Sequence, residues 1–549
     1  MANLSQKKRE RMLAFLQQLK EEHKDDDSVL IALGEIESEL TAKKYGLAWE
    51  QHEEAVDIKM RTHIPVFTEV PEREITAVPG GAYNFLLEGD NLHSLRLLER
   101  THKGKIDVIY IDPPYNTGVQ DFIYNDAYVG KEDRFFHSKW LSFINCRLEI
   151  AKMLLSENGI IFISINDIEV ANLRLLCESV FGEQNFVGQF IWKNRKALDS
   201  RNKTRFSNNH EYIIVFAKNI DKAVLQGKEV SRDKYSNPDN DPRGDWLSCS
   251  ILGLANASQR PNLHYDLVDP STNTVYPPNP NTGWRYSKET IEQKIKEGRI
   301  LFPDKPTGRP REKKFFNEIK SKFTGLSSVL PEEVGYTEDS SKDINAIFNK
   351  RAFDFPKPVA LIKFLVSQIQ NKSAIVLDFF AGSGTTAQAV LELNAADGGN
   401  RKFILCTNNE NGICESVTYP RIRTVITGKR EDGSTYSDGL PANLKYYRTD
   451  FVSKDEEYLS DALLEHMTEM IQLEHGVKID GQQYIIVMDD DEADELAAHW
   501  SDYPDAKALY VSKNVLFTTE QNAIFKDVEI HIIPDYYFSF ELKEVGESW

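Results

Sequence analysis

Hydrophobic positions follow two alternating patterns along much of the chain. From residue 83, short apolar runs that end in an acid are followed by apolar positions three and four residues apart. The first pattern predicts buried strands and the second predicts amphipathic helices. The alternation continues to residue 218 and returns between residues 351 and 450. It predicts an α/β fold with a mostly parallel sheet and helices on both faces.

Other segments depart from this alternation. The first sixty residues have helical spacing, residues 62–80 are punctuated by prolines and predict a linker, and a long central segment is rich in Pro, Asn and Gly. Near the C-terminus a strand–helix–strand pattern lies in an acidic background. These shifts predict five parts: a helical segment (1–62), the first half of an α/β domain (63–218), an inserted domain (219–350), the second half (351–450) and an acidic domain (451–549).

The net charge of −19 is unevenly distributed. Residues 451–549 hold 23 acidic and 6 basic residues, so −17 of the total lies there. Two basic runs stand out elsewhere, residues 193–206 with a balance of +5 and residues 304–323 with +4. Such runs are often only solvated surface, but they can also contact nucleic-acid phosphates. The candidates for DNA contacts are Lys193, Arg195, Arg201, Arg205, Arg309 and Arg311.

Cysteine usage and hydropathy limit the cellular context. The five cysteines form no CxxC pair, which favours buried thiols in a reducing cytoplasm over disulfides. No His/Cys cluster has metal-ligand spacing, so we expect no metal site. No run approaches the roughly 18 apolar residues that a membrane span needs. We therefore expect a cytoplasmic protein without a membrane partner.

The segment "VLDFFAGSGTTAQAV", residues 376–390, predicts a strand, a tight glycine turn and a helix. This arrangement receives nucleotides in α/β folds, although it can also be only a structural turn. No lysine follows Gly384 as a triphosphate-binding loop requires, and the third glycine of a dinucleotide motif is missing. A nucleoside without phosphates remains, and S-adenosylmethionine fits that description.

The segment "KIDVIYIDPPYNTG", residues 105–118, ends an apolar strand on Asp112, two prolines and Tyr115. The Asp112 carboxylate and the carbonyl of Pro113 can each accept a hydrogen bond from an exocyclic amine. Together they would aim the nitrogen lone pair at a methyl donor. The prolines stiffen the corner, and the ring of Tyr115 offers a face for a stacked base. The segment predicts an amine-methylating site.

"DPPYNTG" and "DFFAGSGTT" resemble the catalytic and cofactor motifs of DNA amino-methyltransferases, in the order of the β class. Asp112 resembles the adenine-N6 enzymes, because cytosine-N4 enzymes more often have serine there. The chain further resembles the modification (Mod) subunit of type III restriction–modification systems in "YGLAWEQHEE" (45–54), "LLEGDNLHSL" (86–95), "NNHEYIIVFAK" (208–218), "FDFPKPVALIKFL" (353–365) and "NLKYYRTDFV" (443–452).

This resemblance implies a seven-stranded, Rossmann-like methyltransferase sheet and assigns roles to its motif residues. Trp140 either borders the pocket or belongs to the core, and His210 is structural or faces the base. The catalytic residues implied are Asp112, Pro113, Pro114 and Tyr115. The residues implied for S-adenosylmethionine are Asp90, Asn91, Asp378, Phe380, Gly382, Gly384, Thr385, Glu410, Lys357 and Pro358.

The resemblance also implies partners. The target adenine would be flipped out of double-stranded DNA, and the inserted residues 219–350 would recognise the site. Mod subunits work as dimers with a helicase–nuclease subunit, so a homodimer with such a partner is expected. The alternatives are a solitary adenine or cytosine-N4 methyltransferase and a DNA-binding subunit without catalysis.

Overall fold

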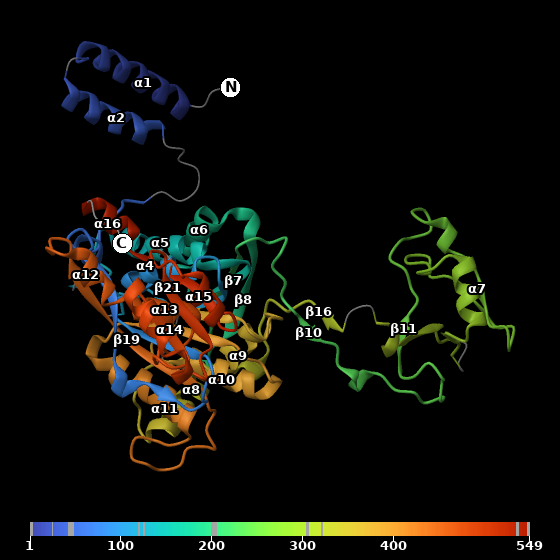
Figure 1. Cartoon of the computed structure of the whole chain (residues 1–549). Coiled ribbons are helices and arrows are strands. Elements are labelled where there is room, and N and C mark those ends of the chain that lie inside the picture. Colours follow the sequence, from blue (N-terminus) through green and yellow to red (C-terminus); the bar gives the residue numbers. More distant parts are fainter. Residues whose placement is uncertain are drawn as a thin grey trace. The chain divides into compact units, whose positions relative to one another are not determined.

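The computed structural model describes residues 4–24, 26–41, 49–118, 121–124, 127–198, 206–303, 307–319, 322–533 and 537–545. The chain forms two compact units, one of Met1–Leu225 with Ser327–Trp549 and one of Gln226–Leu326. The first unit is built around a central sheet (Figure 1).

Within the described residues the central sheet has ten strands in the order β1-β19-β3-β18-β17-β4-β7-β9-β8, with β2 also paired to β19. Neighbours from β19 to β7 run parallel, and the pairs at both ends are antiparallel. The predicted α/β class is confirmed, although the sheet exceeds the seven strands expected. The strands are β1 (His63–Glu69), β2 (Ile75–Thr76), β3 (Tyr83–Glu88), β4 (Ile106–Ile111), β7 (Leu155–Ile165), β8 (Phe186–Lys193), β9 (His210–Ala217), β17 (Ile375–Asp378), β18 (Lys402–Thr407) and β19 (Asn443–Ser453).

The predicted linker at residues 62–80 is wrong for its first part, which forms β1. Ile64, Val66 and Phe67 are buried, and the strand pairs with β19 at the edge of the sheet. Pro65 is tolerated because an edge strand needs hydrogen bonds on one side only. The proline signal therefore marked an edge strand.

Two helical layers cover the sheet (Figure 1). Strands such as β4 and β17 are almost uniformly apolar because parallel strands are buried on both faces. One layer packs α4 against α5 and α5 against α6, and the other packs α9 and α11 against α10. The first layer comprises α4 (Asn91–His102), α5 (Phe136–Leu154) and α6 (Val170–Phe181), and the second α9 (Val359–Ser367), α10 (Thr385–Asp397) and α11 (Tyr419–Thr427).

Further elements extend the first unit. Two N-terminal helices pack against each other, and α13 packs on α4 and β1. None of the helices in the described part of the chain is long and apolar enough to cross a membrane. These elements are α1 (Leu4–Glu22), α2 (Asp27–Thr41), α3 (Ala55–Lys59), β5 (Ile123–Tyr124), β6 (Ala127–Tyr128), α8 (Thr337–Phe348), α12 (Leu459–Leu464) and α13 (Met467–His475).

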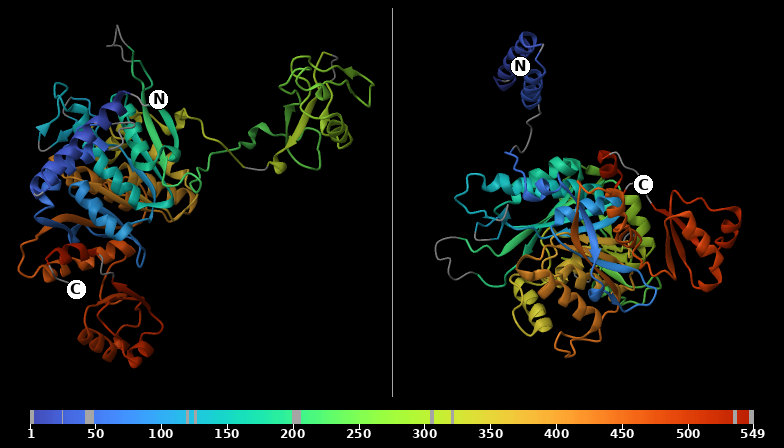
Figure 2. Two further views of the ribbon diagram at one scale, coloured as in Figure 1. Left: turned by 90° about the horizontal axis from the view of Figure 1, so that it is seen from above. Right: turned by 60° about the vertical axis from the view of Figure 1, so that its left-hand side comes forward.

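The acidic C-terminal region has the predicted strand–helix–strand pattern, and its described residues add two further helices and a strand (Figure 2). Three parallel strands form its sheet in the order β20-β21-β22. The predicted start at residue 451 falls inside β19, so this region begins only after α13. Its elements are β20 (Tyr484–Val487), α14 (Asp490–Ala498), β21 (Ala508–Ser512), α15 (Thr519–Ile524), β22 (Glu529–Ile533) and α16 (Ser539–Val545).

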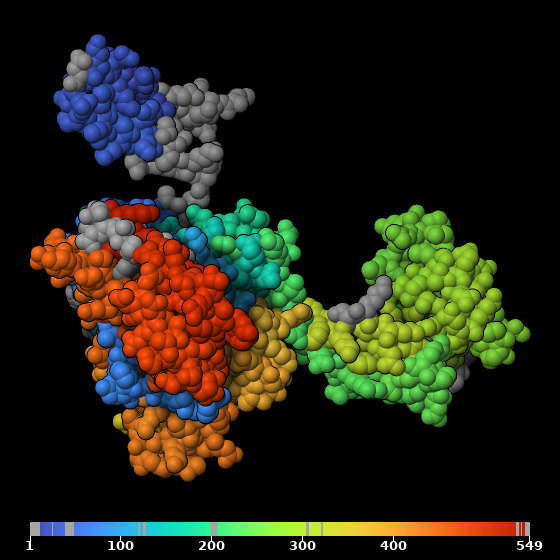
Figure 3. All heavy atoms as spheres, viewed as in Figure 1, coloured from blue at the N-terminus to red at the C-terminus, as the bar shows by residue number. Residues whose placement is uncertain are grey.

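The second unit, Gln226–Leu326, is shorter than the predicted insertion of residues 219–350. Residues beyond 326 return to the first unit, where the Leu330 N–H donates to the carbonyl of Ile191 on β8. The hydrophobic core of the second unit includes the fully buried Trp284. Figure 3 shows the surface of this unit in green and yellow-green. Its elements are β10 (Lys228–Glu229), β11 (Trp246–Ser250), β12 (Leu267–Val268), β13 (Val275–Tyr276), α7 (Lys288–Lys296), β14 (Ile300–Leu301), β15 (Arg311–Phe315) and β16 (Phe323–Thr324).

Candidate active site

The two motifs found in the sequence lie at the carboxyl ends of neighbouring strands. β4 ends just before Asp112, β17 ends on Asp378, and the two strands are paired. The helices that follow them, α5 and α10, belong to opposite layers, so the chain diverges and leaves a crevice between the two loops. A cavity of about 570 Å³ opens there. The predicted site residues that line it are Asp90, Asn91, Asp112, Pro114, Phe380, Gly382 and Glu410.

The end of β3 forms one wall of this cavity. The Asp90 carboxylate caps α4 by accepting the N–H of Leu92 at 2.8 Å. The Asn91 side chain donates to the carbonyl of Phe379 at 2.7 Å, which ties this wall to the glycine loop. Arg147, fully buried on α5, donates to the Asn91 oxygen at 2.6 Å and to Glu54 at 2.7 Å. Burial raises the pKa of the Glu54 carboxyl against the opposing effect of this guanidinium.

The glycine loop is held by Asp378. Its carboxylate accepts the N–H of Phe380 at 3.0 Å and the hydroxyl of Thr386 at 2.5 Å. Burial raises the pKa of Asp378 to about 7, although these hydrogen bonds oppose the shift. Gly384 has a φ of +77°, which residues with a side chain rarely adopt. The Thr385 hydroxyl accepts from Arg421 at 2.8 Å, so it faces the protein interior rather than the cavity.

The predicted catalytic corner consists of Asp112, Pro113, Pro114 and Tyr115. It carries a lysine that the sequence assigned to the cofactor. Lys357 Nζ donates to both oxygens of Asp112, at 2.7 and 2.8 Å, and to the Tyr115 hydroxyl at 2.8 Å. Tyr115 in turn donates to Glu211 at 2.9 Å. The next residue, Pro358, is buried at the start of α9 and does not line the cavity.

Neighbouring charges affect the protonation of Lys357 and Tyr115 at this corner. Burial lowers the pKa of Lys357, but the carboxylates of Asp112 and Glu211 outweigh burial and raise it, so the amine stays an ammonium. Burial, followed by the charge of Asp112, raises the pKa of Tyr115 well above its ordinary value. Tyr115 therefore presents a neutral phenol.

The comparisons with known proteins identify the family. Residues 106–418, more than half of the chain, match the family model described as DNA methylase. This chain belongs to the DNA methylase family. Its resemblance to type III Mod subunits is also confirmed, because the methylase is 32% identical over 427 residues to the StyLTI Mod subunit of Salmonella typhimurium, covering 71% of this chain and 63% of that protein.

Two further relatives agree with this assignment. The type II methyltransferase M.KpnI of Klebsiella pneumoniae is 36% identical over 343 residues, which cover 58% of the methylase and 79% of the relative. The EcoPI Mod subunit of Escherichia phage P1 is 31% identical over 430 residues, which cover 68% of the methylase and 65% of the relative. The methylase thus spans slightly less than two thirds of the length of both Mod subunits.

Neighbouring side chains support the catalytic corner of the methylase. Trp140 is fully buried on α5 and donates its indole N–H to the carbonyl of Pro114 at 2.7 Å, so it belongs to the core and also holds the corner. Asn116, at a φ of +56°, donates to the buried Glu169 at 2.6 Å. His210 contacts the Tyr212 hydroxyl at 3.0 Å.

Sequence reasoning missed Glu211 and Asn194 as site residues. Glu211 lies at the start of the apolar strand β9 and accepts from Tyr115 and from the Asn194 amide, the latter at 2.8 Å. A charged residue inside "NHEYIIVFA" was the available signal, because a carboxylate in a buried strand needs a partner.

The predicted DNA-contacting residues are distributed over both units. Lys193 and Arg195 lie at and just beyond the end of β8, and Lys193 is 3.5 Å from Glu332. In the second unit Arg309 donates to the carbonyl of Pro277 and Arg311 donates to Ser248, each at 2.7 Å. The other two candidates, Arg201 and Arg205, lie outside the described residues.

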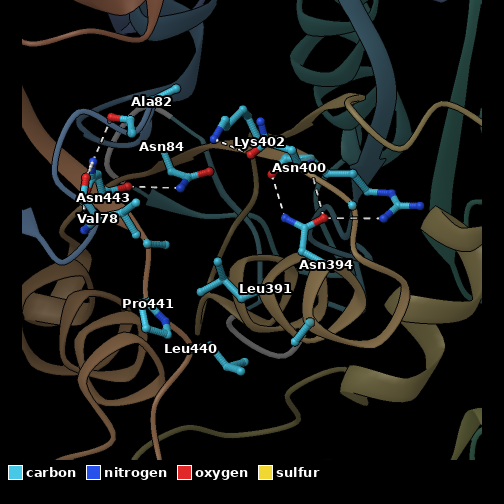
Figure 4. A pocket seen from close by; sticks show the side chains of 15 residues that line it. Val78, Ala82, Asn84, Leu391, Asn394, Asn400, Lys402, Leu440, Pro441 and Asn443 are labelled. Carbon is cyan, nitrogen blue, oxygen red and sulfur yellow. Dashed lines mark hydrogen bonds between the residues drawn. The ribbon is translucent and has the colours of Figure 1, made fainter.

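A second cavity, of about 360 Å³, lies at the opposite, amino end of the strands (Figure 4). Three asparagines lining it bond to the backbone: Asn84 donates to the carbonyl of Asn443 at 3.0 Å, and Asn394 accepts the N–H of Arg401 at 3.0 Å. Asn443 donates to the carbonyl of Val78 at 2.7 Å. These amides stabilise loops, and none of the predicted site residues lies here.

Proposed function

We propose that the methylase transfers the methyl group of S-adenosylmethionine to N6 of an adenine flipped out of double-stranded DNA. We further propose that it is the modification and recognition subunit of a type III restriction–modification system. The observation that carries the proposal is that a single cavity joins the Asp112 corner to Phe380 and Gly382 of the glycine loop.

The residues around the cavity fit the cofactor. The carboxylates of Asp90 and Glu410 suit hydroxyl and amino groups of a nucleoside, and Phe380 offers an apolar surface near Gly382. Asp378 and Gly384 would shape the loop from behind. When bound, S-adenosylmethionine supplies an electrophilic methyl group. Lys357 would act at the catalytic carboxylate and not on the cofactor.

The catalytic corner would activate the target amine by orientation. The adenine amino nitrogen is a poor nucleophile because its lone pair is delocalised into the ring. Asp112 and the carbonyl of Pro113 would each accept one N–H, which directs the lone pair towards the methyl group. The neutral ring of Tyr115 would stack on the base. The new N–C bond would form as the methyl–sulfur bond breaks, with the thioether as leaving group, and the nitrogen would then release one proton to water.

Residues 226–326 would read the target sequence, since an independently packed unit inserted between halves of the catalytic fold can vary without disturbing the sheet. Arg309 and Arg311 of this unit, and Lys193, Arg195, Arg201 and Arg205 of the basic run, would contact phosphates. We further propose that the methylase forms a homodimer and works with a helicase–nuclease subunit in the cytoplasm.

Methyl transfer from tritiated S-adenosylmethionine into unmethylated duplex DNA tests this proposal. Wild type should label the DNA, Asp112→Ala should not, and Asp432→Ala, a change in a surface turn, should match wild type. Single-molecule sequencing of the product would identify the base and its sequence context. A wild type that binds DNA yet labels it no better than Asp112→Ala would overturn the enzymatic proposal, and labelled cytosine would overturn the adenine assignment.

A further inference from the structure

Lys357 contacts the carboxylate that the target amine needs. Its ammonium is 2.7 Å from Asp112, 2.8 Å from the Tyr115 hydroxyl and 3.3 Å from Glu211. The side chains of Lys357 and Glu211 are only 10% and 15% exposed. All the hydrogen-bonding capacity of the ammonium is therefore used inside the catalytic corner.

Two carboxylates share this single ammonium. Carboxylates close together in a buried site repel each other, and one of them takes up a proton unless a cation compensates. Among the described residues, the other titratable groups that interact with this corner are Asp378 from β17, Tyr110 from β4 and Tyr115 from the loop, and none of them carries a positive charge. In the part of the chain that the structure describes, Lys357 is the cation that forms an ion pair with both carboxylates.

Glu211 fixes the positions of the other members. Its Oε2 accepts from Tyr115 and faces Lys357, while its Oε1 accepts from Asn194 at 2.8 Å. A carboxylate with partners on both oxygens is held in one orientation. Its contacts therefore fix the positions of the Tyr115 ring and the Lys357 ammonium. The hydrogen-bonded chain runs from Asn194 through Glu211 and Lys357 to Asp112.

We propose that Lys357 and Glu211 are positioning residues for methyl transfer. Lys357 keeps Asp112 in the ionised form that accepts the N–H of the target amine, and Glu211 anchors Lys357 and Tyr115. An ionised acceptor forms a hydrogen bond about twice as strong as a neutral one. This inference rests on the proposed function of the site, because it assigns Asp112 the role of acceptor.

The test is the pH profile of single-turnover methyl transfer into duplex DNA. In Lys357→Met two carboxylates remain without a cation. The acid limb, the low-pH side of the rate profile, should therefore shift to higher pH by about 1–3 units. Lys357→Arg keeps the charge and should leave the limb in place. Adding Glu211→Gln to Lys357→Met removes one negative charge and should move the limb back towards wild type.

Several outcomes would overturn this inference. An acid limb that stays in place in Lys357→Met, or a double variant that keeps the profile of Lys357→Met, would show that charge balance is not the role of the pair. If Lys357→Met fails to fold, as judged by melting and S-adenosylmethionine binding, Glu211→Gln alone should still move the limb to lower pH, and an unmoved limb would refute the idea. Absent methyl transfer by wild type would instead refute the proposed function itself.

Discussion

Trp140→Phe should slow methyl transfer without weakening DNA binding. The indole N–H of Trp140 donates to the carbonyl of Pro114 at 2.7 Å, and the side chain is fully buried. Phenylalanine fills most of the volume but has no donor. The carbonyl of Pro114 would then lose its partner, and the corner that carries Asp112 would lose a fixed support.

The size of the effect follows from the lost hydrogen bond. Loss of one hydrogen bond to this half-buried carbonyl costs about 0.5–1.5 kcal/mol. If this loss acts on the catalytic geometry, the single-turnover rate constant should fall about 2-fold to 12-fold. The assay is a single-turnover time course at saturating DNA, together with a binding titration of the same DNA.

Trp284→Phe is the matched control. Trp284 is also fully buried and donates to a backbone carbonyl, that of Tyr265, at 2.7 Å, but it lies in the second unit. It should weaken DNA binding and leave the rate constant at saturating DNA unchanged. If Trp140→Phe keeps the wild-type rate constant, or if both variants lower it equally, the indole does not hold the catalytic corner.

Two further predictions concern the glycine loop. Burial raises the pKa of Asp378 from 3.8 to about 7, so its contribution to stability is present at low pH and is lost as the pH rises from about 4 to about 7. The melting temperature of Asp378→Asn relative to that of wild type should therefore rise over this interval. A constant difference between the two melting temperatures would contradict the reasoning. Gly384→Ala should destabilise the methylase more than Gly398→Ala. Both glycines have positive φ, but only a Cβ at Gly384 would lie 3.3 Å from Thr418. Equal losses in melting temperature would exclude that contact as the cause.

The sequence predicted best what depends on local pattern. β4 and β17 are almost continuous apolar runs because both faces are covered. Pro113 and Gly382 follow their ends, and the backbone requirements of these two residues are local. Such local signals can be recognised without knowing which segments lie beside them in the fold. For the same reason Asp112 and the glycine loop could be placed at the ends of strands before the fold was known.

Contacts between distant segments could not be predicted in this way. Lys357 follows Asp112 by 245 residues, so the pattern around either residue carries no trace of their ion pair. Pro65 gave a false signal, because a proline marks a linker and an edge strand equally well until the sheet order is known. The return of residues 327–350 to the first unit depends likewise on pairing with β8, not on composition.

The inserted unit interrupts the chain between the two proposed positioning residues. Glu211 precedes it on β9, and Lys357 follows it just before α9, yet their charged groups lie 3.3 Å apart. The ion pair therefore joins residues from the two sides of the insertion. Glu211 and Lys357 both belong to the first unit, so changes within Gln226–Leu326 need not alter their ion pair. If residues 226–326 read the target sequence, as proposed, the methylase could acquire new recognition sequences while the charge balance at Asp112 stays unchanged.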